Sequence, residues 1–212
     1  MGVRSAGGAE EKALTLDVAR RLRTLVETRL GLRVVLTRND DRAPSLDERA
    51  AVANNGKANL LLSLHVNGSS APSQAGAEVY LLQPDREVEA VARPASAEAV
   101  ALPVLGGGVR RLDLIPWDLA QARHLDDSAR LADVLVEELQ RLQVPMGKRP
   151  LRRAPMRLLA AANMPAALIE MAYLTNPAQH DGLTNDEFKT RVAQGIFSAI
   201  VRFRAWSEEH AP

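Results

Sequence analysis

The 212-residue sequence predicts an α/β fold with a central sheet and helices on both faces. Segments with apolar residues at helical spacing alternate along the chain with short, nearly continuous apolar runs. Such runs are typical of strands covered on both faces of a mostly parallel or mixed sheet. We therefore expect a three-layer domain, spanning residues 1–212, around a twisted sheet of about five to six strands.

The helices are predicted from apolar periodicity and from their end signals. A run from Leu14 to Leu30 is stopped by Gly31, and Ser45 with Glu48 forms a capping-box signature. Asn185 is a candidate cap for the last helix. The predicted helices are 14–30, 45–55, 128–142 and 185–203.

The strands are predicted from apolar runs too short for helices. They are 33–37, 59–65, 77–82, 156–159 and 166–171. Residues 83–126 hold four prolines and the triplet Gly106-Gly107-Gly108, so we expect an irregular insertion there.

Composition narrows the class of protein. The net charge of +1 comes from many charges of both signs, and no basic stripe carries interleaved aromatic residues, which argues against nucleic-acid binding. The absence of cysteine excludes disulfides and thiolate metal ligands. No apolar run approaches the roughly 20 residues that span a bilayer, and the first residues lack the apolar core of a signal peptide. We expect a soluble chain with no membrane partner.

Two polar residues stand at the ends of predicted buried strands. His65 ends the run "NLLLSLH", and Glu170 ends "PAALIE". Ligands of open α/β sheets bind beyond the carboxyl ends of strands, so both are candidate functional residues. A carboxylate among apolar neighbours has to be paired, ligated or protonated, which suits a general base. The alternatives are a histidine bonded to a loop carbonyl and a carboxylate that caps a helix.

Glu10 and Glu11 precede the first helix. Acids in a first turn interact favourably with the helix dipole, so a structural role competes with half of a metal site. The remaining histidines, His124, His180 and His210, are expected on the surface or at a rim.

Taken in order, several fragments resemble the zinc-dependent N-acetylmuramoyl-L-alanine amidases, which are bacterial cell-wall hydrolases. The fragments are "EEKALTLDVARRL", "VVLTRNDDRAPSLDERAAVANN", "ANLLLSLHVNGS", "GAEVYLL", "SARLADVLVEEL" and "MPAALIEMAYLTNPAQ". The resemblance implies that Glu11 and His65 are zinc ligands and that Glu170 is the catalytic carboxylate, with Glu10 a bystander. It implies scaffold roles, a charged pair and a helix anchor, for Arg38, Asp41 and Arg49.

The resemblance also implies the reaction. Zinc-activated water would cleave the amide between N-acetylmuramic acid and L-alanine of peptidoglycan, with Glu170 moving the proton. The native protein would work in the cell envelope or periplasm, or be secreted, and some relatives depend on an activator protein. Trp117, in the irregular region, is a candidate packing or substrate-stacking residue.

One departure from the family pattern affects the expected activity. Family members begin with a strand that ends in an Asp-Pro-Gly-His-Gly-Gly-like turn, and its histidine is a further zinc ligand. Counting back from Glu11 passes Met1 before that turn, so we expect an N-terminally truncated domain without its first strand. A catalytic zinc needs three protein ligands, so we expect weak or absent zinc and impaired activity, unless His124 fills the gap.

Two alternatives to an active amidase remain, together with two origins for the missing strand and one folding consequence. The chain is alternatively a catalytically inactive pseudo-amidase that binds peptidoglycan, or another zinc hydrolase such as a carboxypeptidase. The missing strand has two explanations: either the start of the chain was assigned too far downstream or trimmed away, or the strand was lost naturally in a pseudo-enzyme. A missing strand would also expose a sheet edge, which favours dimerisation or aggregation.

Overall fold

The computed structural model describes residues 2–5, 7–71, 73–83, 100–103, 109–112 and 121–210. Within them, one mixed four-stranded sheet has the order β1–β6–β2–β5. β1 is parallel to β6 and β2 is parallel to β5, whereas β2 and β6 are antiparallel. A separate antiparallel pair consists of β3 and β4. The strands are β1 Leu61–Asn67, β2 Ala77–Leu82, β3 Val100–Pro103, β4 Val109–Leu112, β5 Met146–Ala154 and β6 Ala166–Tyr173.

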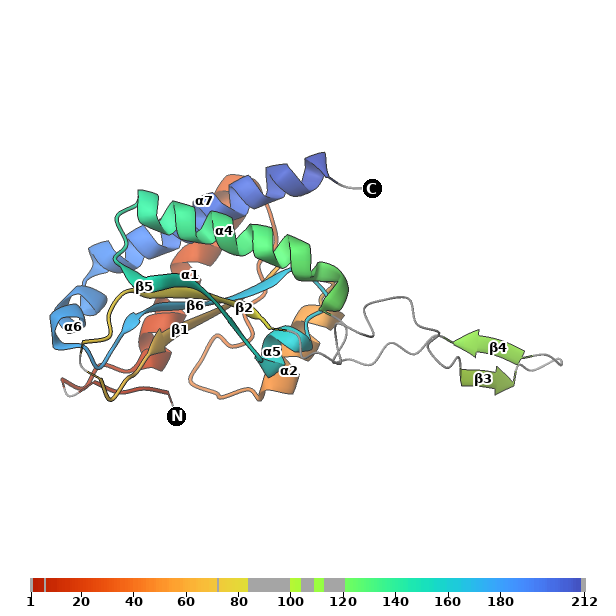
Figure 1. The fold of residues 1–212 in the computed structure, drawn as a ribbon, viewed down its shortest axis with the longest axis horizontal. Coiled ribbons are helices and arrows are strands. Elements are labelled where there is room, and N and C mark those ends of the chain that lie inside the picture. Colours follow the sequence, from red (N-terminus) through yellow and green to blue (C-terminus); the bar gives the residue numbers. More distant parts are fainter. Residues whose placement is uncertain are drawn as a thin grey trace.

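Helices cover both faces of the four-stranded sheet (Figure 1). One face packs on the long helices α1, α4 and α7 in a large apolar core, and the other packs on the short helices α2 and α5 in a smaller core. The predicted three-layer α/β class is confirmed. The helices are α1 Glu11–Leu30, α2 Leu46–Asn55, the 3-10 turn η2 Ala122–His124, α4 Leu125–Arg141, α5 Arg157–Ala160, α6 Pro177–Thr184 and α7 Asp186–Glu209.

The predicted signals for the ends of helices are confirmed at three positions. Gly31 closes α1 in the left-handed region, at φ 64°. Ser45 and Glu48 form both hydrogen bonds of a capping box at the start of α2. The Asn185 side chain accepts a hydrogen bond from the Glu187 backbone N–H at the start of α7.

Two predicted strands are wrong. Residues 33–37 form no strand, because no described strand lies beside them to take their hydrogen bonds. They line a cavity of about 850 Å³ whose other walls include β1, α1 and α2, and Val35 remains 44% exposed. Residues 156–159 lie mostly in α5, where Leu158 and Leu159 pack against β2 and β6. The sheet therefore has four strands among the described residues instead of the expected five to six.

Strand β5 is absent from the sequence prediction. Its sequence, "MGKRPLRRA", contains four cations and a proline, which do not resemble a buried strand. β5 forms at the edge of the sheet, where one side of the backbone faces solvent and charged side chains are tolerated. The predicted irregular region, 83–126, lies largely outside the described residues, and so does Trp117.

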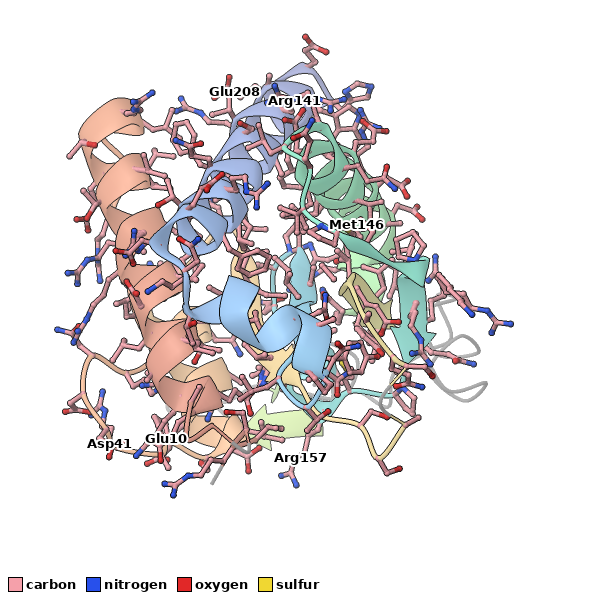
Figure 2. All side chains as sticks on the ribbon, turned by 90° about the vertical axis from the view of Figure 1, so that its left-hand side faces the viewer. Glu10, Asp41, Arg141, Met146, Arg157 and Glu208 are labelled. Carbon is pink, nitrogen blue, oxygen red and sulfur yellow. The ribbon has the colours of Figure 1, made fainter. Side chains whose placement is uncertain are left out.

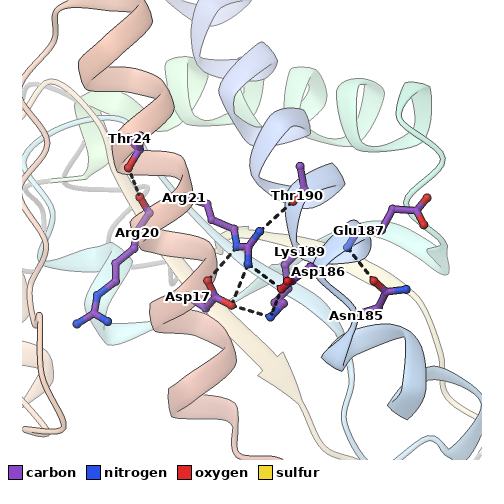
Figure 3. A network of polar contacts seen from close by, with 9 residues as sticks. All are labelled: Asp17, Arg20, Arg21, Thr24, Asn185, Asp186, Glu187, Lys189 and Thr190. Atoms are coloured by element: carbon purple, nitrogen blue, oxygen red, sulfur yellow. Dashed lines mark hydrogen bonds and ion pairs between the residues drawn. The ribbon is translucent and has the colours of Figure 1, made fainter.

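An ionic cluster joins α1 to α7 across the large core (Figure 3). Asp17 accepts from Arg21 at 2.9 Å and from Lys189 at 2.7 Å, and both cations also reach Asp186 at 2.8 Å. Hydrogen bonds from Arg21 are the main cause of the lowered pKa of the Asp17 carboxyl. The cluster holds α1, which begins with Glu11, in a fixed position on the sheet.

The strand register sets the polar groups of the site in a row. His65 on β1 lies opposite Glu170 on β6, and Glu170 lies opposite Glu78 on β2. Register partners project to the same face of a sheet. That face also carries Leu168 and Tyr80, which pack in the smaller core, so the polar row lies beyond the end of that core.

Among the described residues, no helix has the length and apolar character that crossing a bilayer requires.

Candidate functional site

The side chain of Glu11, the first residue of α1, points toward His65 and Val66 of β1. Its carboxylate accepts hydrogen bonds from the Val3 N–H at 2.8 Å and, at 3.4 Å, from the Val66 N–H. Its Oε1 lies 2.9 Å from Nδ1 of His65. Burial opposes ionisation of Glu11, but the hydrogen bonds from His65 and Val3 outweigh it and lower the pKa of the carboxyl. The structure therefore holds Glu11 ionised beside His65.

Glu10 has a different environment from its neighbour. It forms ion pairs with Arg4 and Lys12 on the surface, and Lys12 also binds Asp41 at 2.8 Å. Figure 2 shows Glu10 and Asp41 near each other beside the start of α1. Glu10 thus takes part in a surface charge network.

His65 lies in β1 with 30% of its side chain exposed. Its Nε2 is 3.1 Å from the Ser63 hydroxyl, while its Nδ1 faces Glu11. The imidazole is therefore oriented by a partner on each ring nitrogen, which fixes the ring at the edge of the site.

Glu170 lies in β6 opposite His65, in a mostly buried position. Its Oε2 is buried and has no hydrogen-bond partner among the described residues. Burial raises the pKa of the Glu170 carboxyl to about 7, the positive influence of His65 opposes this rise, and the charges of Glu11 and Glu78 add to it. A carboxyl with a pKa near neutral pH is suited to accept and return a proton.

Sequence reasoning missed Glu78. It lies in β2, next to Glu170 across the antiparallel pair, and its side chain is 9% exposed. Oε2 of Glu78 accepts hydrogen bonds from the Tyr80 hydroxyl at 2.8 Å, the Tyr173 hydroxyl at 3.2 Å and Arg152 at 3.2 Å. The available signal was a charged residue inside the otherwise apolar run "AEVYLL".

Two of the described residues offer donor atoms of the kind that zinc takes. Glu11 and His65 offer a carboxylate oxygen and an imidazole nitrogen, both suitable for zinc. No group of three or more His, Cys, Asp or Glu side chains suited to a metal ion occurs in the described part of the chain. The donor set thus fits two ligand positions and leaves a third unfilled by the residues that the structure describes.

Neither His124 nor His210 completes this set. His124 immediately precedes α4 and lies beside Asn163. Asn163 comes before the first residue of β6, whereas Glu170 lies in the second half of that strand. Burial lowers the pKa of His124. His210 stacks on Trp206 at the end of α7, and the side chain of His180 is outside the described residues.

The three residues expected to be scaffold make structural contacts. Arg38 donates to the Lys12 carbonyl at 2.6 Å and to the Thr15 hydroxyl at 3.1 Å. Arg49 donates to the Pro44 carbonyl at 3.0 Å, which ties α2 to the loop before it. The ion pair of Asp41 is with Lys12.

The raised pKa of Glu170 predicts a pH-dependent stability. The folded state binds this proton more tightly than the unfolded state, so stability falls as the pH rises from about 4.5 to about 7. Glu170→Gln has no carboxyl to ionise at this position. In metal-free protein, its free energy of unfolding should therefore rise relative to that of the wild type by up to about 3 kcal/mol between pH 4 and pH 8. Urea unfolding in a chelator, with exposed Glu209→Gln as control, measures the difference. A gap between Glu170→Gln and wild type that stays constant with pH would contradict the assignment.

Comparison with known proteins shows which protein family the chain matches. Residues 1–202 match the family model described as N-acetylmuramoyl-L-alanine amidase. The N-acetylmuramoyl-L-alanine amidase AmiC of Neisseria meningitidis is 32% identical over 206 residues, which cover 95% of this chain and 49% of that protein. AmiC of Escherichia coli is 27% identical, with 92% and 48% covered. The chain therefore spans about half the length of these relatives.

Solved structures share the fold. The amidase Ami1 from Mycobacterium smegmatis superposes with a TM-score of 0.74 at 24% identity, covering 97% of this chain and 82% of that one. The CwlD amidase from Clostridioides difficile, solved in complex with the GerS lipoprotein, gives 0.73 at 21% identity, with 97% and 92% covered. Since the family match extends over nearly the whole sequence, the chain belongs to the N-acetylmuramoyl-L-alanine amidase family.

Proposed function

We propose that this domain hydrolyses the amide bond between N-acetylmuramic acid and the L-alanine of the peptidoglycan stem peptide. The observation that carries the proposal is the convergence of Glu11, His65 and Glu170 from α1, β1 and β6. The names of the relatives support the same reaction.

Glu170 is the proposed proton carrier. Its buried Oε2 has no partner in the described structure and its pKa is about 7, so the carboxylate form is available to take a proton from attacking water. The protonated form can then donate to the leaving amine.

Glu11 and His65 are the proposed zinc ligands. A bound zinc ion would supply Lewis-acid polarisation of the amide carbonyl and a more acidic water. The two side chains already lie within 2.9 Å of each other, and the Val3 N–H and Ser63 hydroxyl orient them. A third protein ligand has to come from outside this pair, so we infer weak zinc binding and impaired turnover.

The proposed setting is the cell envelope or periplasm, where peptidoglycan is found. An accessory protein is part of the proposal, with support from the CwlD amidase that was solved in complex with the GerS lipoprotein. A partner of this chain would contact the amidase fold that this chain shares with CwlD.

A pseudo-amidase that binds peptidoglycan without cleaving it is the second candidate. The specific observation in its favour is that the described residues form no group of three or more side chains suited to a metal ion. A catalytic zinc needs three protein ligands. In this case Glu170 would contribute to binding alone.

Turnover separates the two candidates. We expect the protein to release peptides with a free amino-terminal alanine from purified peptidoglycan in the presence of excess zinc, detected by mass spectrometry. Glu170→Gln should lower the rate by about 10²- to 10⁴-fold, because general acid–base catalysis is lost. Glu10→Gln is the matched control, since Glu10 lies on the surface beside Glu11, and it should retain the wild-type rate. Peptidoglycan binding without release in the wild type would instead establish the pseudo-amidase.

Zinc affinity tests the incomplete ligand set. Calorimetric titration should give weak binding, with a dissociation constant above the micromolar range, since two protein ligands hold zinc less tightly than three. His65→Ala should abolish even this signal, while His210→Ala should leave it unchanged. Stoichiometric binding at sub-micromolar concentration would show that the chain has a complete site.

A further inference from the structure

The edge strand β5 is unusually basic for this nearly neutral chain. Lys148, Arg149, Arg152 and Arg153 occur within nine residues, and all four side chains are exposed. Figure 2 shows long side chains ending in nitrogen that extend outward from the strand beginning at Met146. Cations on an edge strand discourage edge-to-edge pairing, and this general role accounts for side chains that point into solvent.

Arg152 differs from its neighbours on β5 because it is tied to the interior. Its Nη1 donates to Oε2 of Glu78 at 3.2 Å, and its Cζ lies 5.2 Å from the centre of the Tyr80 ring. These contacts combine a charge-assisted hydrogen bond with a cation–π interaction. The guanidinium is thus held in place, although 44% of the side chain remains exposed.

The anchor of Arg152 is itself rigid. Glu78 is buried and also accepts hydrogen bonds from the hydroxyls of Tyr80 and Tyr173. Burial and the neighbouring Glu78 charge raise the pKa of both tyrosines, so both hydroxyls keep their protons and donate. The contacts that the structure describes for Arg152 use a donor on Nη1 alone, which leaves most of the five N–H donors of its guanidinium for a further anion.

Arg152 projects to the same face as Glu170. Arg152 is the register partner of Tyr80, and Tyr80 lies two residues from Glu78, which faces Glu170. Arg152 is level with Leu168, two residues before Glu170, so the two backbones are about 12 Å apart at the usual strand spacing and rise. The Arg152 side chain reaches back toward Glu78 over part of this distance, and an extended peptide of about three residues covers the rest.

We propose that Arg152 is a substrate-binding residue that binds a carboxylate of the stem peptide, two or three residues beyond the amide presented to Glu170. This inference rests on the proposed amidase function and adds a specificity for acidic over amidated peptides. A guanidinium binds a carboxylate through two parallel hydrogen bonds, which a carboxamide cannot match. A purely structural role, neutralising Glu78, gives no such preference.

The test compares two soluble muramoyl tripeptides, one with free carboxylates on its second and third residues and one with carboxamides. Their dissociation constants are measured by NMR titration of the metal-free protein, so that binding is read without turnover. We expect the acidic peptide to bind at least tenfold more tightly to the wild type. Arg152→Gln should reduce this ratio to about one, and Arg152→Lys should retain part of it, because the charge remains while the fork is lost.

Arg153→Gln is the matched control. Arg153 is the next residue on β5, is also exposed, and by strand alternation projects to the opposite face. It should keep the wild-type preference. Equal affinity of the wild type for the two peptides, no binding of either, a preference that survives in Arg152→Gln, or an equal loss in Arg153→Gln would each overturn the proposal. Failure of the amidase function is recognised separately, as absence of zinc-dependent peptide release.

Discussion

The parallel pairing of β1 with β6 is the constraint on which the site depends. This pairing places His65 directly opposite Glu170 on the neighbouring strand. Both strands are covered on one face by the large core, so their register cannot slip without exposing Ile169 and Met171 or burying charge. The position of the site is therefore a consequence of core packing.

Glu11 joins this row from a different element. α1 is held on the sheet by its buried leucines and valines and by the Asp17 cluster with α7. Its first residue is thereby brought to the end of β1, where the carboxylate meets His65 and the Val66 N–H. A residue that would otherwise serve only the helix dipole becomes part of a carboxylate–imidazole pair. The opposite end of the row, Glu78, is fixed in the same way by tyrosines and Arg152.

The sequence was sufficient to predict the elements whose signals are local. The capping box at Ser45 and the Gly31 stop produce the structures expected of them. The apolar runs at 59–65 and 166–171 form strands, but His65 and Glu170 lie inside them and not at their ends, because β1 and β6 continue to Asn67 and Tyr173. Residues 33–37 were mispredicted because a strand needs a neighbour, which a local apolar pattern does not reveal. β5 was missed for the converse reason, since an edge position permits a basic sequence that local rules assign to a loop. Glu78 and its partners required the register, which joins residues up to 95 positions apart.

The sheet places Glu170 in a half-buried position beside His65, Glu11 and Glu78, where burial raises the pKa of its carboxyl to about 7. An NMR titration of the side-chain carboxyl carbon of Glu170, in metal-free protein labelled with ¹³C, measures this most directly. The account predicts a midpoint near pH 7, well above that of an exposed glutamate. A midpoint near pH 4.5 would contradict it, because the carboxyl would then be solvated and unsuited to the proposed proton transfer.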